Sequence, residues 1–238
     1  MFTAAVDSPS SRLPDLLDLA LTHCPQPEAA VTLVSQLPER STGLAALAAT
    51  LISQQVTQYR ADALGGEPDA PNRLARALNN LSVRLTDLGR AEAALAAIEE
   101  AAPIYRELAA ARPDAFRPRL ADSLTNLSNS LASLGRREDA LAAIEEAAPI
   151  YRELAAARPD AFRPGLANSL NNLSIRLADL GRREDALAAI EEAVTVRREL
   201  AARWPDAYHH ELEESLRVAA RLERGEDLSD ASPQAPKE

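Results

Sequence analysis

Three asparagines recur at one position of a repeated segment and carry polar groups that could hold another chain. Asn80, Asn126 and Asn172 lie 46 residues apart, and each directly precedes a leucine of an apolar stripe. An asparagine amide both donates and accepts hydrogen bonds, so a row of amides can hold an extended main chain without demanding a particular sequence. The same amides could instead bridge neighbouring helices, and the sequence leaves both interpretations open.

Other side chains near these asparagines are expected to project to the same groove, at spacings of three or four positions along a helix. They differ between the repeats, as a selective surface would require and as random drift would also produce. The predicted binding residues beside the asparagine row are Arg76, Asn79, Val83, Asp122, Thr125, Asn129, Asn168, Asn171 and Ile175.

Paired acids form a second recurring set. They are Glu99–Glu100, Glu145–Glu146 and Glu191–Glu192. A ladder of acids could bind a basic partner. A solvated helix face is the simpler interpretation, and we prefer it.

Recurring aromatic residues form a third set. Tyr105 and Tyr151 are each followed by an arginine and could anchor a ligand. In the third repeat Arg197 stands at the tyrosine position, which favours packing between repeats over ligand binding.

The inventory for catalysis and metal binding is small. His23 and Cys24 are adjacent, so on a helix they point to different faces, and no acid is spaced to form a nucleophilic site with them. His209 and His210 lack the i, i+4 spacing of a helical metal site, and no glycine-rich phosphate loop occurs. The sequence predicts no enzyme, no metal and no cofactor.

Composition narrows the class of protein. The chain has 238 residues, 46% of them hydrophobic, and a formal net charge of −10, which disfavours a nucleic-acid partner. A single cysteine excludes an internal disulfide, and neither a signal sequence nor a membrane-spanning run is recognised. We therefore expect a cytoplasmic protein with no membrane contact.

The elements that must position these residues follow from an internal repeat. The segment Ala94 to Pro118 returns unchanged at Ala140 to Pro164, and Gly89, Gly135 and Gly181 share the same period of 46. A fixed period of this size indicates stacked supersecondary units that bury their apolar faces against one another. The sequence therefore predicts an elongated all-α array.

Each unit reads as two helices. The first, helix A, carries leucines at i, i+3 and i+7, such as Leu124, Leu127 and Leu131, and a glycine follows where the helix must end. The second, helix B, is long and contains Pro103 or Pro149 in the first two repeats, so we expect a bend there. The segment around residues 112–118 reads as a long linker between units.

These residues resemble the tetratricopeptide repeat in its longer, kinesin-light-chain-like form. With Leu127 at the family's first helix-A leucine, the small and large signature positions are met by Leu124, Ser128, Leu131, Gly135, Ala140, Ile144 and Ala147. The match covers about residues 75 to 200 in three copies. The sequence of these repeats is similar to that of arrays in actinobacterial signalling proteins.

The resemblance implies a right-handed α-solenoid of antiparallel helix pairs, the TPR superhelix. In kinesin-light-chain-like members the matching asparagines line the concave surface and hold an extended peptide. Actinobacterial arrays of this kind often accompany ATPase or caspase-like domains, none of which is recognised here. The chain is therefore expected to be a stand-alone array or a binding subunit.

The expected organisation places caps at both ends of the array. Its parts are a lead-in at 1–10, an N-terminal helical cap with a degenerate half-repeat at 11–72, repeats at 73–118, 119–164 and 165–208, a capping helix at 209–224 and a disordered acidic tail at 225–238. The function we predict is a non-catalytic adaptor that binds a peptide or protein in its concave groove. The alternative is a scaffold that self-assembles through its repeat ends, which would make the chain a homo-oligomer.

Overall fold

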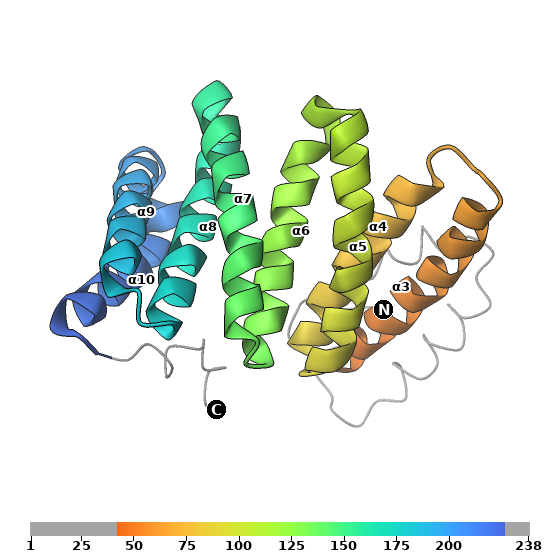
Figure 1. Cartoon of the computed structure of the whole chain (residues 1–238), viewed down its shortest axis with the longest axis horizontal. Helices are drawn as coiled ribbons and strands as arrows, with labels where there is room; N and C mark the ends of the chain where they lie inside the picture. The colour runs from red at the N-terminus through yellow and green to blue at the C-terminus, as the bar shows by residue number, and fades with distance from the viewer. Residues whose placement is uncertain (1–41, 227–238) are drawn as a thin grey trace, which may run out of the picture. The chain divides into compact units, whose positions relative to one another are not determined.

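The computed structural model describes residues 42–226, and every regular element in this range is an α-helix. In chain order the helices are α3 (Thr42–Leu64), α4 (Ala70–Asp87), α5 (Ala91–Ala111), α6 (Pro113–Ser133), α7 (Arg137–Ala157), α8 (Pro159–Asp179), α9 (Arg183–Arg203) and α10 (Pro205–Arg224) (Figure 1). The predicted lead-in, the helices expected near 14–22 and 28–36, and the tail from 227 onward lie outside the described residues.

The chain divides into two compact units, Met1–Leu108 and Ala109–Glu238, so the division falls inside α5. In the first unit α3 packs against α4. In the second unit each of the helices α6 to α10 packs against the next, and α6 also contacts α8. Because the connecting loops are very short, successive helices are antiparallel, and the predicted all-α fold of helix pairs is confirmed.

Helices α4, α6 and α8 are the A helices, and α5, α7 and α9 are the B helices. Each A helix ends at the glycine that the sequence predicts: Gly89, Gly135 and Gly181 have φ values of 69°, 73° and 73°. The next residue closes the helix end. For example, the amide of Arg136 donates to the carbonyl of Leu131 at 3.0 Å. This six-residue closure needs a left-handed residue, which glycine supplies without a Cβ penalty.

The predicted apolar faces form the core. Leu124 and Leu170 on the A helices, and Ala140, Ile144 and Ala147 on α7, are all 0% exposed. Of the predicted stripe, Leu127 is only half-buried.

The predicted long linker is wrong, because only Arg112 separates α5 from α6. Pro113 occupies the first turn of α6, where an N–H would have no helical partner and the fixed φ of proline suits the helix. Pro118 lies inside the same helix and removes a single backbone bond near its start. The predicted boundary between the first two repeats, after residue 118, therefore falls within α6.

The prolines of helix B do not break it. Pro103 and Pro149 are exposed and lie inside α5 and α7, which run without interruption. The third repeat has Thr195 at this position, and its hydroxyl donates to the carbonyl of Glu191 at 2.9 Å. The bend expected near residues 146–148 stays a prediction.

The last described helix begins earlier than predicted. The capping helix expected from residue 209 is α10, which starts at Pro205, in the same way that α8 starts at Pro159. By its start and its 46-residue spacing from α8, α10 corresponds in position to an A helix. None of the described helices is long and apolar enough to cross a membrane.

Candidate binding surface on the A helices

The predicted binding residues of the second unit lie on two A helices that contact each other. We call this set the A-helix row; it comprises Asp122, Thr125, Asn126 and Asn129 on α6, and Asn168, Asn171, Asn172 and Ile175 on α8. All are exposed or half-buried. Corresponding residues keep the 46-residue register, so the same helix positions recur on α6 and α8.

Asn172 has a side-chain amide that is open to another molecule. The residue is half-buried, and within residues 42–226 its amide makes no hydrogen bond. A half-buried amide without a partner favours water or a ligand that can both donate and accept. Asn126 holds the same position on α6 and is also half-buried.

Asp122 does not stand free, because Tyr151 of the following B helix donates its hydroxyl hydrogen to the Asp122 carboxylate. The Tyr151 ring is 6% exposed and lies against Gly165 on α8, where a Cβ atom would come within 2.4 Å of the ring. Burial, together with the charge and hydrogen bond of Asp122, raises the pKa of Tyr151. Tyr151 therefore packs between repeats, in agreement with the preferred interpretation.

The third repeat replaces this pair with a buried arginine network. Arg197 on α9 is 5% exposed and donates to Asn168 Oδ1 at 2.9 Å, to Ser215 Oγ at 2.7 Å and to the carbonyl of Glu211. Ser215 on α10 in turn donates to Asn171 Oδ1 at 2.9 Å. Burial lowers the pKa of Arg197, and the nearby Glu214 and Glu211 oppose that effect. Two predicted binding residues, Asn168 and Asn171, are thus joined to the third repeat's core.

The A-helix row continues onto α10 at positions that the sequence analysis missed. Adding the 46-residue period to Asn168, Asn171, Asn172 and Ile175 leads to Glu214, Arg217, Val218 and Arg221. Glu214 and Arg217 are exposed, whereas Val218 and Arg221 are half-buried. The sequence does contain a signal for these positions. The segment Pro-Asp-Ala-Tyr at the start of α10 matches Pro-Asp-Ala-Phe at the start of α8, which marks α10 as a helix in the same register.

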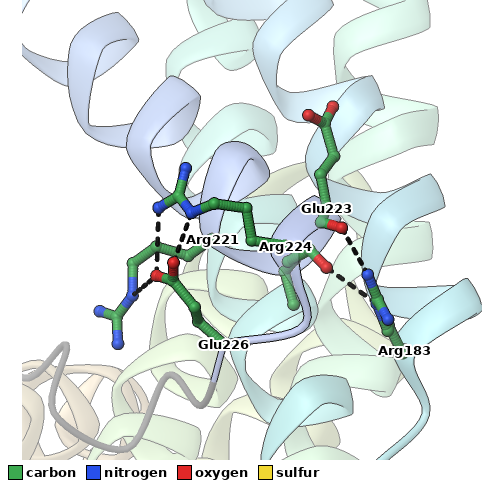
Figure 2. A network of polar contacts seen from close by, with 6 residues as sticks. Arg183, Arg221, Glu223, Arg224 and Glu226 are labelled. Carbon is green, nitrogen blue, oxygen red and sulfur yellow. Dashed lines mark hydrogen bonds and ion pairs between the residues drawn. The ribbon is translucent and has the colours of Figure 1, made fainter.

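The C-terminal end of α10 is anchored to α9 (Figure 2). Arg183, at the start of α9, donates to the carbonyls of Leu222 at 2.8 Å and Glu223 at 2.6 Å, in the last turn of α10 where carbonyls lack i+4 amide donors. On the other side, Glu226 accepts from Arg224, which lowers the Glu226 pKa. These contacts fix the position of α10 as the last member of the row.

The paired acids take part in contacts between helices rather than forming a free ladder. In the first unit Arg60 binds Glu100, at 2.5 Å, and in the second unit Arg152 binds Glu192, at 2.6 Å. These pairs join α3 to α5 and α7 to α9, and in each the arginine and the acid are 40 residues apart. Glu145 is also paired, with Arg182 at 3.0 Å.

The predicted residues of the first unit lie on α4. Arg76 and Asn80 are exposed, Asn79 is half-buried, and Val83 is 39% exposed. Tyr105 on α5 is 2% exposed, as expected of a packing residue. The two units are described separately, so joining Asn80 to the row of the second unit stays a prediction.

The histidines of α10 pair with acids on their own helix. His209 lies 3.3 Å from Glu213 and His210 lies 3.3 Å from Glu214, both as exposed i, i+4 pairs. Among residues 42–226 no group of three or more metal-ligating side chains gathers at one place. His23 and Cys24 lie outside the described residues.

Comparison with known proteins follows the helix pairs. The family model of the tetratricopeptide repeat matches residues 74–111, 120–157 and 166–202, which are the pairs α4–α5, α6–α7 and α8–α9. These three segments are repeats of the tetratricopeptide-repeat family. Repeats of this family generally mediate protein–protein interaction.

Two solved structures share this tetratricopeptide-repeat fold. BtubC (BKLC) from P. vanneervenii matches with a TM-score of 0.52 and 20% identity, over 79% of this chain and 76% of that chain. A putative kinesin light chain with nearly identical TPR-like repeats, from Podospora anserina, matches with a TM-score of 0.58 and 16% identity, over 88% of this chain and 100% of that chain. The resemblance to kinesin-light-chain-like repeats is thereby confirmed at the level of the fold. Curated protein sequences give no match.

Proposed function

We propose that this tetratricopeptide-repeat protein is a non-catalytic adaptor that binds an extended segment of a partner protein along its A-helix row. The observation that carries the proposal is the half-buried, unpartnered amide of Asn172, which shares its repeat position with Asn126 on the neighbouring A helix. Amides repeated on neighbouring A helices can pair with peptide groups a few residues apart along an extended chain. Side chains around them differ between α6 and α8, which gives such a surface a means of selection.

The amides can be tested by substitution, because Asn126 and Asn172 are only half-buried and lie within regular helices. Each hydrogen bond contributes roughly 0.5–1.5 kcal/mol, so replacing both asparagines with alanine should weaken binding by about five- to a hundredfold. The assay is capture of partners from the native lysate, followed by titration of the captured partner.

The matched control is Thr195→Ala on α9. Thr195 is exposed, and its hydroxyl bonds only to its own helix. This variant should capture the same partner with unchanged affinity. Equal capture by the double asparagine variant, with its helical circular dichroism intact, would show that the A-helix row is not the binding surface.

A second candidate function is self-association through α10. Leu216 is 38% exposed, whereas Leu170 at the same position of α8 is 0% exposed, because no helix within residues 42–226 follows α10 to cover it. A second copy could cover this face. Light scattering over a concentration series tests this candidate by measuring the mass of the natural chain and of Leu216→Glu. If both remain monomers at every concentration, self-association through α10 is rejected.

A further inference from the structure

In the hydrogen-bond network around Arg197, the donor and the acceptor of each bond are fixed. A guanidinium group has donors and no acceptor, so the atoms of Asn168 and Ser215 that face Arg197 must accept. They are Asn168 Oδ1 at 2.9 Å and Ser215 Oγ at 2.7 Å. Ser215 has one hydroxyl hydrogen, and it donates this hydrogen to Asn171 Oδ1 at 2.9 Å. One buried arginine therefore sets the orientation of both asparagine amides.

The consequence appears at the surface of the A-helix row. The carbonyl oxygens of Asn168 and Asn171 are occupied by the network, and their Nδ2 groups have no partner among the described residues. Arg217 occupies the corresponding position on α10, is exposed and carries only donors. This part of the row thus presents N–H groups, and Glu214 is the acid that lies beside them.

The second repeat presents the opposite chemistry. Tyr151 donates to Asp122, so the carboxylate at that position keeps its remaining lone pairs as acceptors. Asp122 and Asn168 share one repeat position, as do Tyr151 and Arg197. The change from Tyr–Asp to Arg–Asn therefore turns an acceptor position into a donor position between α6 and α8.

We propose that the α8–α10 part of the A-helix row selects an acidic side chain of the bound peptide, and that Arg197 is the positioning residue for this selection. The proposal rests on the proposed function. A carboxylate fits because its oxygens only accept, whereas the free Nδ2 groups of Asn168 and Asn171 and the guanidinium of Arg217 only donate, and charge-assisted bonds are stronger than neutral ones. Ser215 extends the same control to Asn171, which makes α10 part of the binding surface as well as the end of the array.

The test is selection from a phage-displayed library of random 12-residue peptides on the full chain. The variants are Arg197→Met, which keeps the length of the side chain and removes its donors, and Ser215→Ala, which places there the alanine found at residue 77 of α4. Arg197→Met leaves Asn168 Oδ1, Ser215 Oγ and the carbonyl of Glu211 without their donor and should lower stability, so circular dichroism first checks that the variant is folded. Arg198→Met is the control, because Arg198 is the exposed neighbour and carries the same charge.

The natural chain and Arg198→Met should enrich peptides that contain Asp or Glu. For one enriched peptide, changing its acid to the matching amide should weaken binding to the natural chain about tenfold or more, and by less than about twofold to Arg197→Met. Ser215→Ala should give an intermediate ratio, and it replaces Arg197→Met if that variant is unfolded. A merely structural role for Arg197 would lower the melting temperature and leave this ratio unchanged.

Two results would overturn the inference: enriched peptides without acids, or an acid-to-amide ratio in Arg197→Met and Ser215→Ala that equals the natural one. Failure to enrich any peptide is a different result. It would refute the proposed function itself, and the inference with it.

Discussion

Gly165 offers a direct test of the packing between repeats. A Cβ atom at this position would lie 2.4 Å from Cε1 of Tyr151 and 3.0 Å from its Cδ1 and Cζ. The ring is rigid, 6% exposed and tied to Asp122 by its hydroxyl, so it cannot move aside cheaply. Gly165→Ala therefore forces a shift of α8 or loss of the Tyr151 hydrogen bond.

Two opposing effects decide how much Gly165→Ala changes the free energy of unfolding. Overpacking of a core by one methyl group costs about 1–3 kcal/mol. Alanine is a better helix former than glycine by about 1 kcal/mol, and residue 165 lies inside α8. The free energy of unfolding should thus fall by about 1 kcal/mol, within a range of roughly 0–2.

A double-mutant cycle with Tyr151→Leu separates the two effects. Without the ring, only the helix-propensity term remains, so Gly165→Ala should stabilise the Tyr151→Leu chain by up to about 1 kcal/mol. Urea denaturation followed by circular dichroism at fixed pH measures all four chains. If Gly165→Ala has the same effect in both backgrounds, the contact between Tyr151 and Gly165 does not exist as described.

Three further outcomes are expected. Gly135→Ala should lower stability by about 1–2 kcal/mol in thermal or urea melts, because residue 135 has a φ of 73°. Because burial raises the pKa of Tyr151 above its usual value near 10, the unfolded chain loses this proton first as pH rises; stability should therefore fall above about pH 10, and Tyr151→Phe should reduce that fall in melting temperature. Arg152→Met should cost less than about 1 kcal/mol and the loss should vanish in 1 M salt, since Arg152 and Glu192 are 44% and 39% exposed.

The features that local chemistry encodes were predictable from the sequence. The leucine period of the A helices and the glycines that end them were predicted, and both are confirmed. A stripe such as Leu124 and Leu131 needs only helix geometry to be recognised, and a left-handed residue at Gly135 needs only the absence of a Cβ atom. Neither depends on knowing which helix lies opposite.

Helix starts were harder to predict, because proline can either interrupt a helix or occupy its first turn. Pro113 and Pro118 together suggested an extended linker, since proline inside a helix removes a hydrogen bond. Pro113 instead starts α6, where no bond is lost, and Pro118 follows within the early turns. The same misreading placed the start of α10 at His209, four residues after Pro205.

In the candidate site, the contacts made at a repeat position could not be predicted from the sequence. Asp122 and Asn168 were both predicted as binding residues, and nothing near either in sequence shows that its partner lies 29 residues onward, on the B helix. Once the contact between Tyr151 and Asp122 is known, the 46-residue period predicts the matching contact between Arg197 and Asn168. The period does not transfer the direction of the hydrogen bonds beyond that contact, because tyrosine gives one donor whereas arginine gives several and reaches Ser215 on a third helix. Repetition therefore predicts where contacts form, and the residue at each copy decides which groups remain for a ligand.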